Sequence, residues 1–443
     1  MARADFPEEI LDNIVNMVHY QPCHHENYCI KTRKEGLVVQ NSLKGVPYEV
    51  YLNHSGPPIL NTFQNLAVVN RRFHRLCCPK LWQHIQFPST LPAPITLWTN
   101  NILLRHGHLV KSLEVQLEDD QLVGDIHKIL SKRSSYDNTG VIPKLQHGVG
   151  SYRPKYGIGL YNIEKLFKAC PSLVSISVIV PESSHVHEEW ISHITASLHV
   201  PFWRVPQLQD LRLTHCPNDS ITSEYVVNIL QRLPSLVSLE LCGFEFRQRP
   251  AMEESFEWSL GQQKNLRKLR MEHLTYVDGT WTLFSSWPPQ LENLQVIGCD
   301  RLSPRVLHGL LSGSAPSLTK LRLILHHFKD EPHVTVRFNL PALKELSILH
   351  RGDLDLLMSF ENCKSVEAFH YQCHADDEEW HSMKQYLSRC TWPKLSVLDF
   401  RSSIFTANWK KPAKMDVNEI WNSFKIKLLI DNETDDEIDD EAV

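Results

Sequence analysis

The sequence of 443 residues lacks any long hydrophobic run, and no stretch of it approaches the ~20 apolar residues that a membrane-spanning helix needs. Its first residues, MARADFPEEILDNIV, interleave acidic with apolar side chains and so lack the layout of a secretory signal. The 11 cysteines are odd in number and scattered, which is typical of reduced thiols rather than of a disulfide framework. These absences predict a protein of the cytoplasm or the nucleus that does not bind a membrane.

The sequence also lacks the common motifs of catalysis: a Walker loop, a Gly-x-Ser-x-Gly elbow or paired catalytic carboxylates. His187 and His193 of HEEWISH are six residues apart rather than the four that a zinc-protease helix requires. GIGLYN (157–162) lacks the third glycine of a dinucleotide loop, and CHHENYC (23–29) matches no common zinc spacing. We therefore expect no catalytic residue, no cofactor and no metal. A hydrolase hidden in the insertions would require a pocket with converging titratable groups.

An excess of charge is confined to the end of the chain. Residues 431–443 carry eight acidic side chains and no basic one, and they more than account for the net charge of −5. A segment with so few apolar groups does not offset the entropy of ordering, so we expect it to be a disordered acidic tail. The rest of the chain is close to neutral, and nothing in it favours nucleic acid as a partner.

What the sequence does contain is a recurring phrase, Pro-x-Leu-x-x-Leu-x-Leu, with PQLQDLRL from Pro206 and PSLTKLRL from Pro316 among its clearest copies. Successive copies are separated by 23 to 35 residues, apart from a first gap of 64. Leucine-rich repeats recur every ~20–29 residues, so most of these spacings fit and the first two require insertions. The first apolar anchors are Leu109, Leu173, Leu208, Leu236, Leu266, Leu291, Leu318, Leu343, Val366 and Leu395.

The phrases alternate at period two, which predicts short strands, and helical patterns such as 223–234 and 303–316 fill the gaps between them. The predicted fold class is therefore α/β: a leucine-rich-repeat solenoid with parallel strands on the concave face and helices on the convex face. We place the array at 91–409, with an insertion near 131–159. Residues 410–430 are predicted to cap the open end of the stack, with a helix over 417–430.

A small all-α unit is predicted to precede the array, over residues 1–90. An amphipathic helix begins at Pro7, a second is expected over Leu60–Leu76, and a short third piece over Pro79–Ile85. Residues 21–59 contain four prolines and no sustained period, so we read them as an inserted loop.

This unit resembles an F-box. FPEEILDNIV (6–15) and LAVVNRRFHRLCCPKLWQHI (66–85) supply the Pro-started helix, the Val-x-Arg-Arg-Phe core and the Leu-Trp pair in the family's order. The insertion at 21–59 departs from the usual continuous motif, and Phe6 replaces the commoner leucine. The resemblance implies a non-catalytic, substrate-recruiting subunit of an SCF-type (cullin–RING) ubiquitin ligase, which binds the Skp-type adaptor. The residues implied in adaptor contact are Pro7, Ile10, Leu11, Ile14, Val69, Phe73, Leu81 and Trp82.

The strand alternation places a row of polar side chains on the concave face. Five positive residues cluster there, which gives the hypothesis that the target is bound through an acidic or phosphorylated motif. Three alternatives remain open: an ordinary solvated strand face, a helical unit that merely covers the array, and a repeat scaffold that binds proteins without any ligase. The five residues are Arg212, Lys268, Arg270, Lys320 and Arg322.

Overall fold

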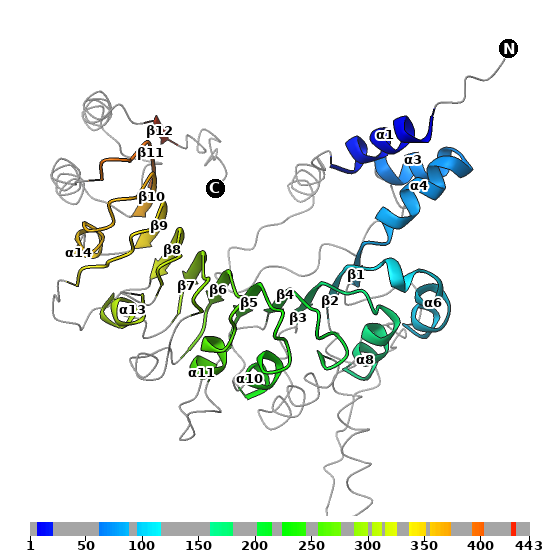
Figure 1. Ribbon diagram of the computed structural model, residues 1–443, viewed down its shortest axis with the longest axis horizontal. Helices are drawn as coiled ribbons and strands as arrows, with labels where there is room; N and C mark the ends of the chain where they lie inside the picture. Colours follow the sequence, from blue (N-terminus) through cyan, green and yellow to red (C-terminus); the bar gives the residue numbers. More distant parts are fainter. Residues whose placement is uncertain are drawn as a thin grey trace, which may run out of the picture. The chain divides into compact units, whose positions relative to one another are not determined.

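The computed structural model divides the chain into two compact units, Met1–Ile85 and Gln86–Val443 (Figure 1). Several predicted features lie outside the residues that it describes: 21–59, 131–159, His187 and His193, most of the predicted terminal helix, and 431–443. The described residues are 7–20, 62–87, 95–116, 160–179, 202–214, 224–244, 256–275, 288–299, 304–311, 315–325, 336–350, 355–373, 392–402 and 427–430.

The described residues of the first unit form three helices: α1 (Glu8–Tyr20), α3 (Thr62–Val69) and α4 (Arg71–Leu81). They surround a small core in which Val15, Ala67 and Cys77 are almost completely buried. Glu8 of α1 forms an ion pair with Arg75 of α4 at 2.5 Å, so the two helices are also joined at the surface. The described residues of this unit are helical up to Leu81, as predicted, and strand β1 (His84–Phe87) follows within the predicted range 1–90.

Two details of these helices differ from the prediction. The expected single helix over Leu60–Leu76 is wrong, because Asn70 is extended and its side-chain oxygen accepts hydrogen bonds from the N–H groups of Arg72 and Phe73, at 2.9 and 3.0 Å. This N-cap starts a new helix and changes the chain's direction. The separate helical piece over Pro79–Ile85 is also wrong: α4 includes Pro79, and the next element is strand β1 (His84–Phe87).

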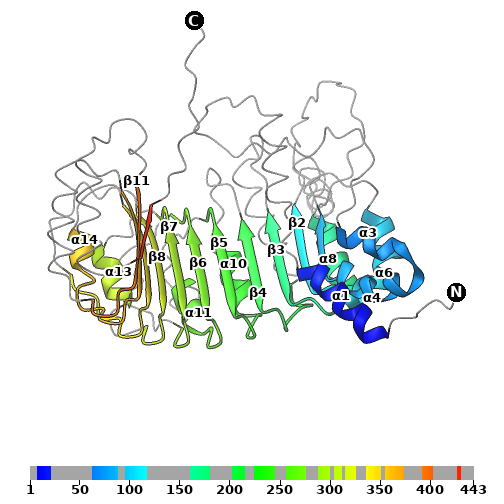
Figure 2. The same ribbon diagram turned by 90° about the horizontal axis from the view of Figure 1, so that it is seen from above.

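The described strands form one 12-stranded sheet in strict sequence order, and every pair from β2 to β12 is parallel. In Figure 2 the strands of the array lie side by side and point in the same direction. These strands are β2 (Ser112–Gln116), β3 (Ser175–Ile179), β4 (Asp210–Thr214), β5 (Ser238–Cys242), β6 (Lys268–Glu272), β7 (Asn293–Ile297), β8 (Lys320–Leu325), β9 (Glu345–His350), β10 (Ala368–Cys373), β11 (Val397–Ser402) and β12 (Lys427–Ile430).

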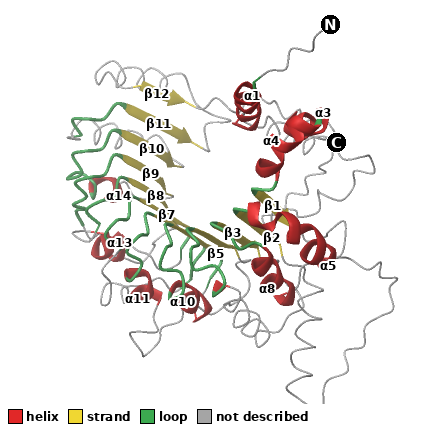
Figure 3. Cartoon of the chain, turned by 45° about the vertical axis from the view of Figure 1, so that its right-hand side comes forward, coloured by secondary structure: helices red, strands yellow, loops and turns green. Residues whose placement is uncertain are grey.

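Helices cover the outer side of the second unit, and the strands line its inner side (Figure 3). The array begins with a helical segment over 95–109 that contains α5 (Ile95–Leu97), a π-helical turn (Trp98–Ile102), α6 (Leu103–His106) and a 3₁₀ turn (Gly107–Leu109). The helices between strands are α8 (Leu160–Ala169), α10 (Glu224–Leu230), α11 (Phe256–Gly261), α13 (Pro304–Leu311) and α14 (Asp355–Met358). The predicted leucine-rich-repeat solenoid is therefore confirmed. No helix in the described part of the chain is long and apolar enough to cross a membrane.

The recurring phrase explains how each repeat is joined to the one before it. Its leucines are buried, as Leu211 and Leu213 are at 2% exposure, while Arg212 between them points to the other face. The second residue of the phrase bonds back to the preceding repeat: the Asn265 side-chain amide donates to the Pro234 carbonyl at 3.1 Å. Gln207 does the same toward Pro171 at 2.9 Å. A polar second residue therefore satisfies a carbonyl that the turn leaves without a strand partner.

The residue directly after the strand adopts positive φ in three successive repeats: Gly243 (80°), His273 (50°) and Gly298 (59°). In each case its backbone N–H donates to a backbone carbonyl at the end of the next strand, as that of Gly298 does to the Ile324 carbonyl at 2.7 Å. The left-handed conformation favours glycine, and His273 occupies it in the middle of the three. This turn ends the pairing at the equivalent strand position in these three repeats.

Two predictions about the ends of the array are wrong. The first anchor is Val110, which is fully buried, rather than Leu109, because Ser112 aligns with Ser175 and so places Val110 opposite Leu173. At the other end, Lys427–Ile430 form strand β12 rather than the end of a helix. Strand β11 would otherwise present an unpaired edge, and β12 satisfies its backbone groups by parallel pairing.

Candidate concave-face site

The strand register places the predicted polar residues in one row across the inner side of the array. In this row each residue is the direct partner of the next on the neighbouring strand, so the sequence-based alternation is confirmed. The row contains Arg212, Glu240, Arg270, Gln295, Arg322, Ser347, His370 and Asp399.

Carboxylates neutralise the positive charges at one end of the row. Glu240 lies between two arginines, with its Oε1 at 3.4 Å from Arg212 Nε and 3.3 Å from Arg270 Nε. Arg270 also donates to Glu272 through Nη2 at 2.6 Å. Partial burial lowers the pKa of Arg270, but the hydrogen bond and the charge of Glu272 raise it by more, so the guanidinium stays charged. Glu272 was missed from the sequence, although its place two residues after Arg270 puts it on the same face.

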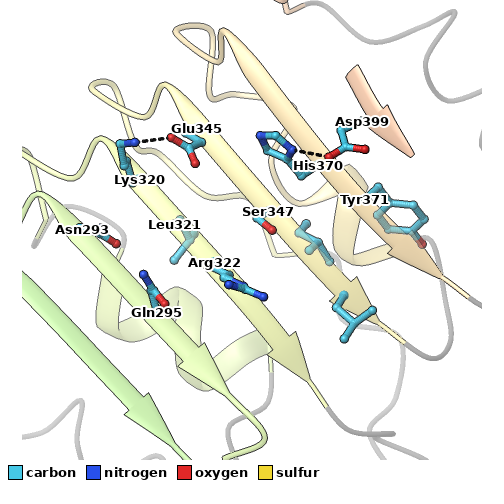
Figure 4. A pocket seen from close by; sticks show the side chains of 12 residues that line it. Asn293, Gln295, Lys320, Leu321, Arg322, Glu345, Ser347, His370, Tyr371 and Asp399 are labelled. Carbon is cyan, nitrogen blue, oxygen red and sulfur yellow. Dashed lines mark hydrogen bonds and ion pairs between the residues drawn. The ribbon is translucent and has the colours of Figure 1, made fainter. Parts of the chain in front are cut away.

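The other end of the row forms a hollow of about 460 Å³ over β7 to β11 (Figure 4). Four of its polar side chains interact in two pairs: Lys320 Nζ lies 2.5 Å from Glu345 Oε2, and His370 Nδ1 lies 3.0 Å from Asp399 Oδ2. Asp399 is only 4% exposed. The hollow is lined by Asn293, Gln295, Lys320, Leu321, Arg322, Glu345, Ser347, Ile348, Leu349, His370, Tyr371 and Asp399.

The five predicted target-binding residues therefore differ in their surroundings. Arg212, Arg270 and Lys320 each face a carboxylate. Arg322 and Lys268 are exposed and form no ion pair or hydrogen bond within the described ranges, and only Arg322 of these two lines the hollow. The predicted groove is thus a row whose first three residues alternate in charge and whose hollow contains one arginine, Arg322, without an ionic partner among the described residues.

Ser347, His370 and Asp399 stand in the order of a hydrolytic triad on three adjacent strands. His370 and Asp399 are hydrogen-bonded, but among the described residues no hydrogen bond joins Ser347 to His370. A nucleophilic serine requires a base within hydrogen-bonding reach, and this pair does not supply it. Among the described residues, no group of three or more His, Cys, Asp or Glu side chains could hold a metal ion. The row offers hydrogen bonds and charge to a bound molecule.

The predicted adaptor-contact residues of the first unit divide into exposed and buried sets. Ile10 and Val69 are 44% and 64% exposed, and Pro7 is exposed as well. Leu11, in contrast, is only 5% exposed. Phe73 and Leu81 pack against the core of the unit, while Ile14 and Trp82 are half-buried.

Two further exposed apolar residues of this unit were not among the predicted ones. Met17 on α1 is 66% exposed and Val68 on α3 is 69% exposed. Met17 follows Ile10 and Ile14 at helical spacing, so the amphipathic pattern of α1 contained the signal that would have found it. The exposed apolar side chains of α1 and α3 are called the apolar strips below.

Burial protects two of the described cysteines of the array, Cys170 and Cys363, and gives a prediction about pH. Burial raises the pKa of the Cys170 thiol to about 12 and that of Cys363 to about 11. The folded state therefore keeps these protons at a pH where the unfolded chain has lost them, so stability is full below pH ~9 and falls as the pH rises from there. We expect a lower urea midpoint at pH 10 than at pH 8.

We also expect iodoacetamide at pH 8 to leave both thiols unmodified until urea is added, and rapid modification of the native protein would contradict this.

No family model and no curated protein matches this chain. Among solved structures, an internalin (inlF) from Listeria monocytogenes is similar at 12% identity and a TM-score of 0.28, over 61% of this chain and 69% of that one. The Rad7 and Elc1 complex from yeast is similar at 13% identity and a TM-score of 0.27, over 61% of this chain and 77% of that one. Scores this low carry no argument about function, and the assignment to leucine-rich repeats stands on the strand register and the repeated phrase.

Proposed function

We propose that this protein is a non-catalytic, substrate-recruiting subunit of an SCF-type ubiquitin ligase. Its first unit binds a Skp-type adaptor, and its repeat array binds the target protein. Such a subunit performs no chemistry, because its contribution is to raise the effective concentration of the target near a ubiquitin-loaded enzyme. The setting that fits this role is the cytoplasm or the nucleus.

The observation that carries the proposal is the exposed apolar surface of the first unit. Its three helices bury only a small core, and the apolar strips leave four large apolar side chains exposed on two short helices. A stable soluble unit that presents so many apolar side chains is typical of a protein–protein contact. The F-box resemblance covers α1, the end of α3 and α4, and it gives the class of the partner. The four residues are Ile10, Met17, Val68 and Val69.

The test is co-purification of the full chain with a Skp-type adaptor and a cullin. We expect a stable complex with the adaptor when the two are expressed together, and recruitment of the cullin only when the adaptor is present. If the chain elutes alone from size-exclusion chromatography in the presence of excess adaptor, the proposal is wrong.

The alternative is a leucine-rich-repeat scaffold that binds proteins outside any ligase. The alternating charges of the concave row favour protein binding in either case, because they give specificity without requiring catalysis. The two candidate functions differ only in whether the chain binds a Skp-type adaptor. A chain that captures a target but no adaptor is this scaffold.

A further inference from the structure

Arg322 is the one charged side chain of the hollow without an ionic partner among the described residues. The other titratable groups of the hollow are paired, Lys320 with Glu345 and Asp399 with His370, while Arg322 is exposed. An arginine in this position presents a planar fork of N–H donors toward the concave space. A ligand that enters the hollow can therefore pair with a positive charge that has no ionic partner among the described residues.

The neighbours of Arg322 on both sides are uncharged and polar. In the register, Gln295 of β7 is its partner on one side and Ser347 of β9 is its partner on the other. Figure 4 shows the three side chains along one line across the strands. They offer additional hydrogen bonds next to the guanidinium and no competing carboxylate.

The charged side chains of the hollow favour a ligand with a single negative charge. Lys320 and Arg322 contribute two positive charges, and Glu345 and Asp399 contribute two negative ones. Lys320 is already paired with Glu345, so a monoanion bound to Arg322 supplies the ionic partner that this arginine lacks among the described residues. A phosphate dianion or a run of acidic residues would bring extra negative charge close to Glu345 and Asp399, and like charges at such an interface are unfavourable. This is a narrower requirement than the acidic or phosphorylated motif that the sequence suggested.

Three apolar side chains on neighbouring strands, Ile297, Ile324 and Leu349, lie beside Arg322 and are called the apolar ledge. Ile324 is two residues farther along β8, so it stands on the same face about 7 Å away. Its register partners are Ile297 and Leu349, and Leu349 also lines the hollow. Ile297 is 8% exposed, and the other two are half-buried. A ligand that combines one anion with a neighbouring apolar group satisfies both features.

The His370–Asp399 pair adds a hydrogen-bond acceptor. In the tautomer whose Nδ1 donates to the Asp399 carboxylate, Nε2 of His370 carries a free lone pair. A peptide N–H of a ligand is a suitable donor for this atom. The hollow thus combines a fork for a carboxylate, a ledge for an apolar side chain and an acceptor for a backbone amide.

We infer that the hollow around Arg322 binds the free C-terminal carboxylate of a partner protein whose last side chain is apolar. The last residue of a chain carries its carboxylate and its side chain on one Cα, so it brings the anion and the apolar group within one residue's reach. An internal aspartate or glutamate needs a second residue for the apolar part. The inference rests on the proposed role of the array as the target-binding part. It adds that the array recognises the C-terminus of the target.

The experiment uses the full chain and fluorescein-labelled peptides of glycine and serine that end in two leucines. Anisotropy titrations compare the free acid with the C-terminal amide, with an amidated peptide that carries an internal aspartate and with an amidated phosphoserine peptide. We expect the free acid to bind at least 10-fold more tightly than each of the others, which is about 1.4 kcal/mol. Arg322→Gln should abolish this preference, and Arg305→Gln, which changes an exposed arginine of α13 outside the hollow, should leave it unchanged.

Three results would overturn the inference: equal binding of acid and amide, tighter binding of the aspartate or phosphoserine peptide, or no binding of any peptide tighter than about 1 mM. The same preparations are tested for adaptor capture, which Arg322→Gln should not change. If the preference holds but no adaptor is captured, the ligase proposal fails and the terminal-carboxylate site stands on the scaffold. If the adaptor is captured but the preference is absent, only the inference fails.

Discussion

Replacing Ile10 and Val69 together by aspartate is expected to abolish capture of a Skp-type adaptor. Both side chains are exposed on the apolar strips, at 44% and 64%, so the change leaves the core of the first unit intact. Under the proposed function, each substitution places a charge within an apolar contact with the adaptor. Central apolar anchors of this kind are worth about 2 kcal/mol or more, so we expect adaptor binding to weaken by about 30-fold or more in a pull-down or calorimetric titration.

The matched control is Leu104→Asp, because Leu104 is 72% exposed on α6, outside the first unit. It introduces the same charge at a comparable apolar site and should leave adaptor capture unchanged. Leu11 is unsuitable as a probe: at 5% exposure, an aspartate there would be buried and would unfold the helices. If the Ile10 and Val69 double variant keeps its helical circular dichroism and still captures the adaptor, the apolar strips are not the adaptor site.

The concave row could be predicted because a strand has a fixed side-chain period. Once the leucines of each phrase are assigned to the core, Arg212, Arg270 and Arg322 must point to the opposite face, and the common phrase brings them into register. The same logic fails where the phrase is degenerate. In the first copy both Leu109 and Val110 are apolar, and only the pairing of Ser112 with Ser175 shows that Val110 is the anchor.

The contacts within each face could not be predicted in the same way. Period two places Glu240 and Arg270 on one surface, but whether their side chains meet depends on rotamers and on neighbours from three strands. Likewise, the helical period assigns Ile10 and Leu11 to an apolar arc, and only the packing of α3 and α4 decides that Leu11 is buried and Ile10 is not. The hollow lies beyond the ion pairs that join Arg212, Glu240 and Arg270 within the row, and side chains from five strands line it together. A single repeat therefore could not reveal it.

The largest loss of stability is expected from Phe360→Ala, in the last part of the array. The ring of Phe360 is fully buried and stacks on that of Phe338, with centroids 4.4 Å apart and an interplanar angle of 10°. Its carbonyl also accepts the hydrogen bond of the buried Trp392 indole at 3.2 Å. Removal of such a ring leaves a cavity between consecutive repeats, and Phe→Ala changes at buried sites cost about 3–5 kcal/mol.

Because each repeat contacts only its neighbours, this loss should be local. We expect hydrogen exchange in Phe360→Ala to accelerate in β9, β10 and β11, while β4 and β5 keep their protection. Met358→Ala is the matched control: Met358 lies two residues away on α14 and is 45% exposed, so its truncation should change stability by no more than about 0.5 kcal/mol. Uniform acceleration across all strands would mean that the array unfolds as one cooperative unit. The hollow lies over the strands that this stack supports, so a local loss of protection there should also weaken peptide binding at Arg322 while leaving adaptor capture intact.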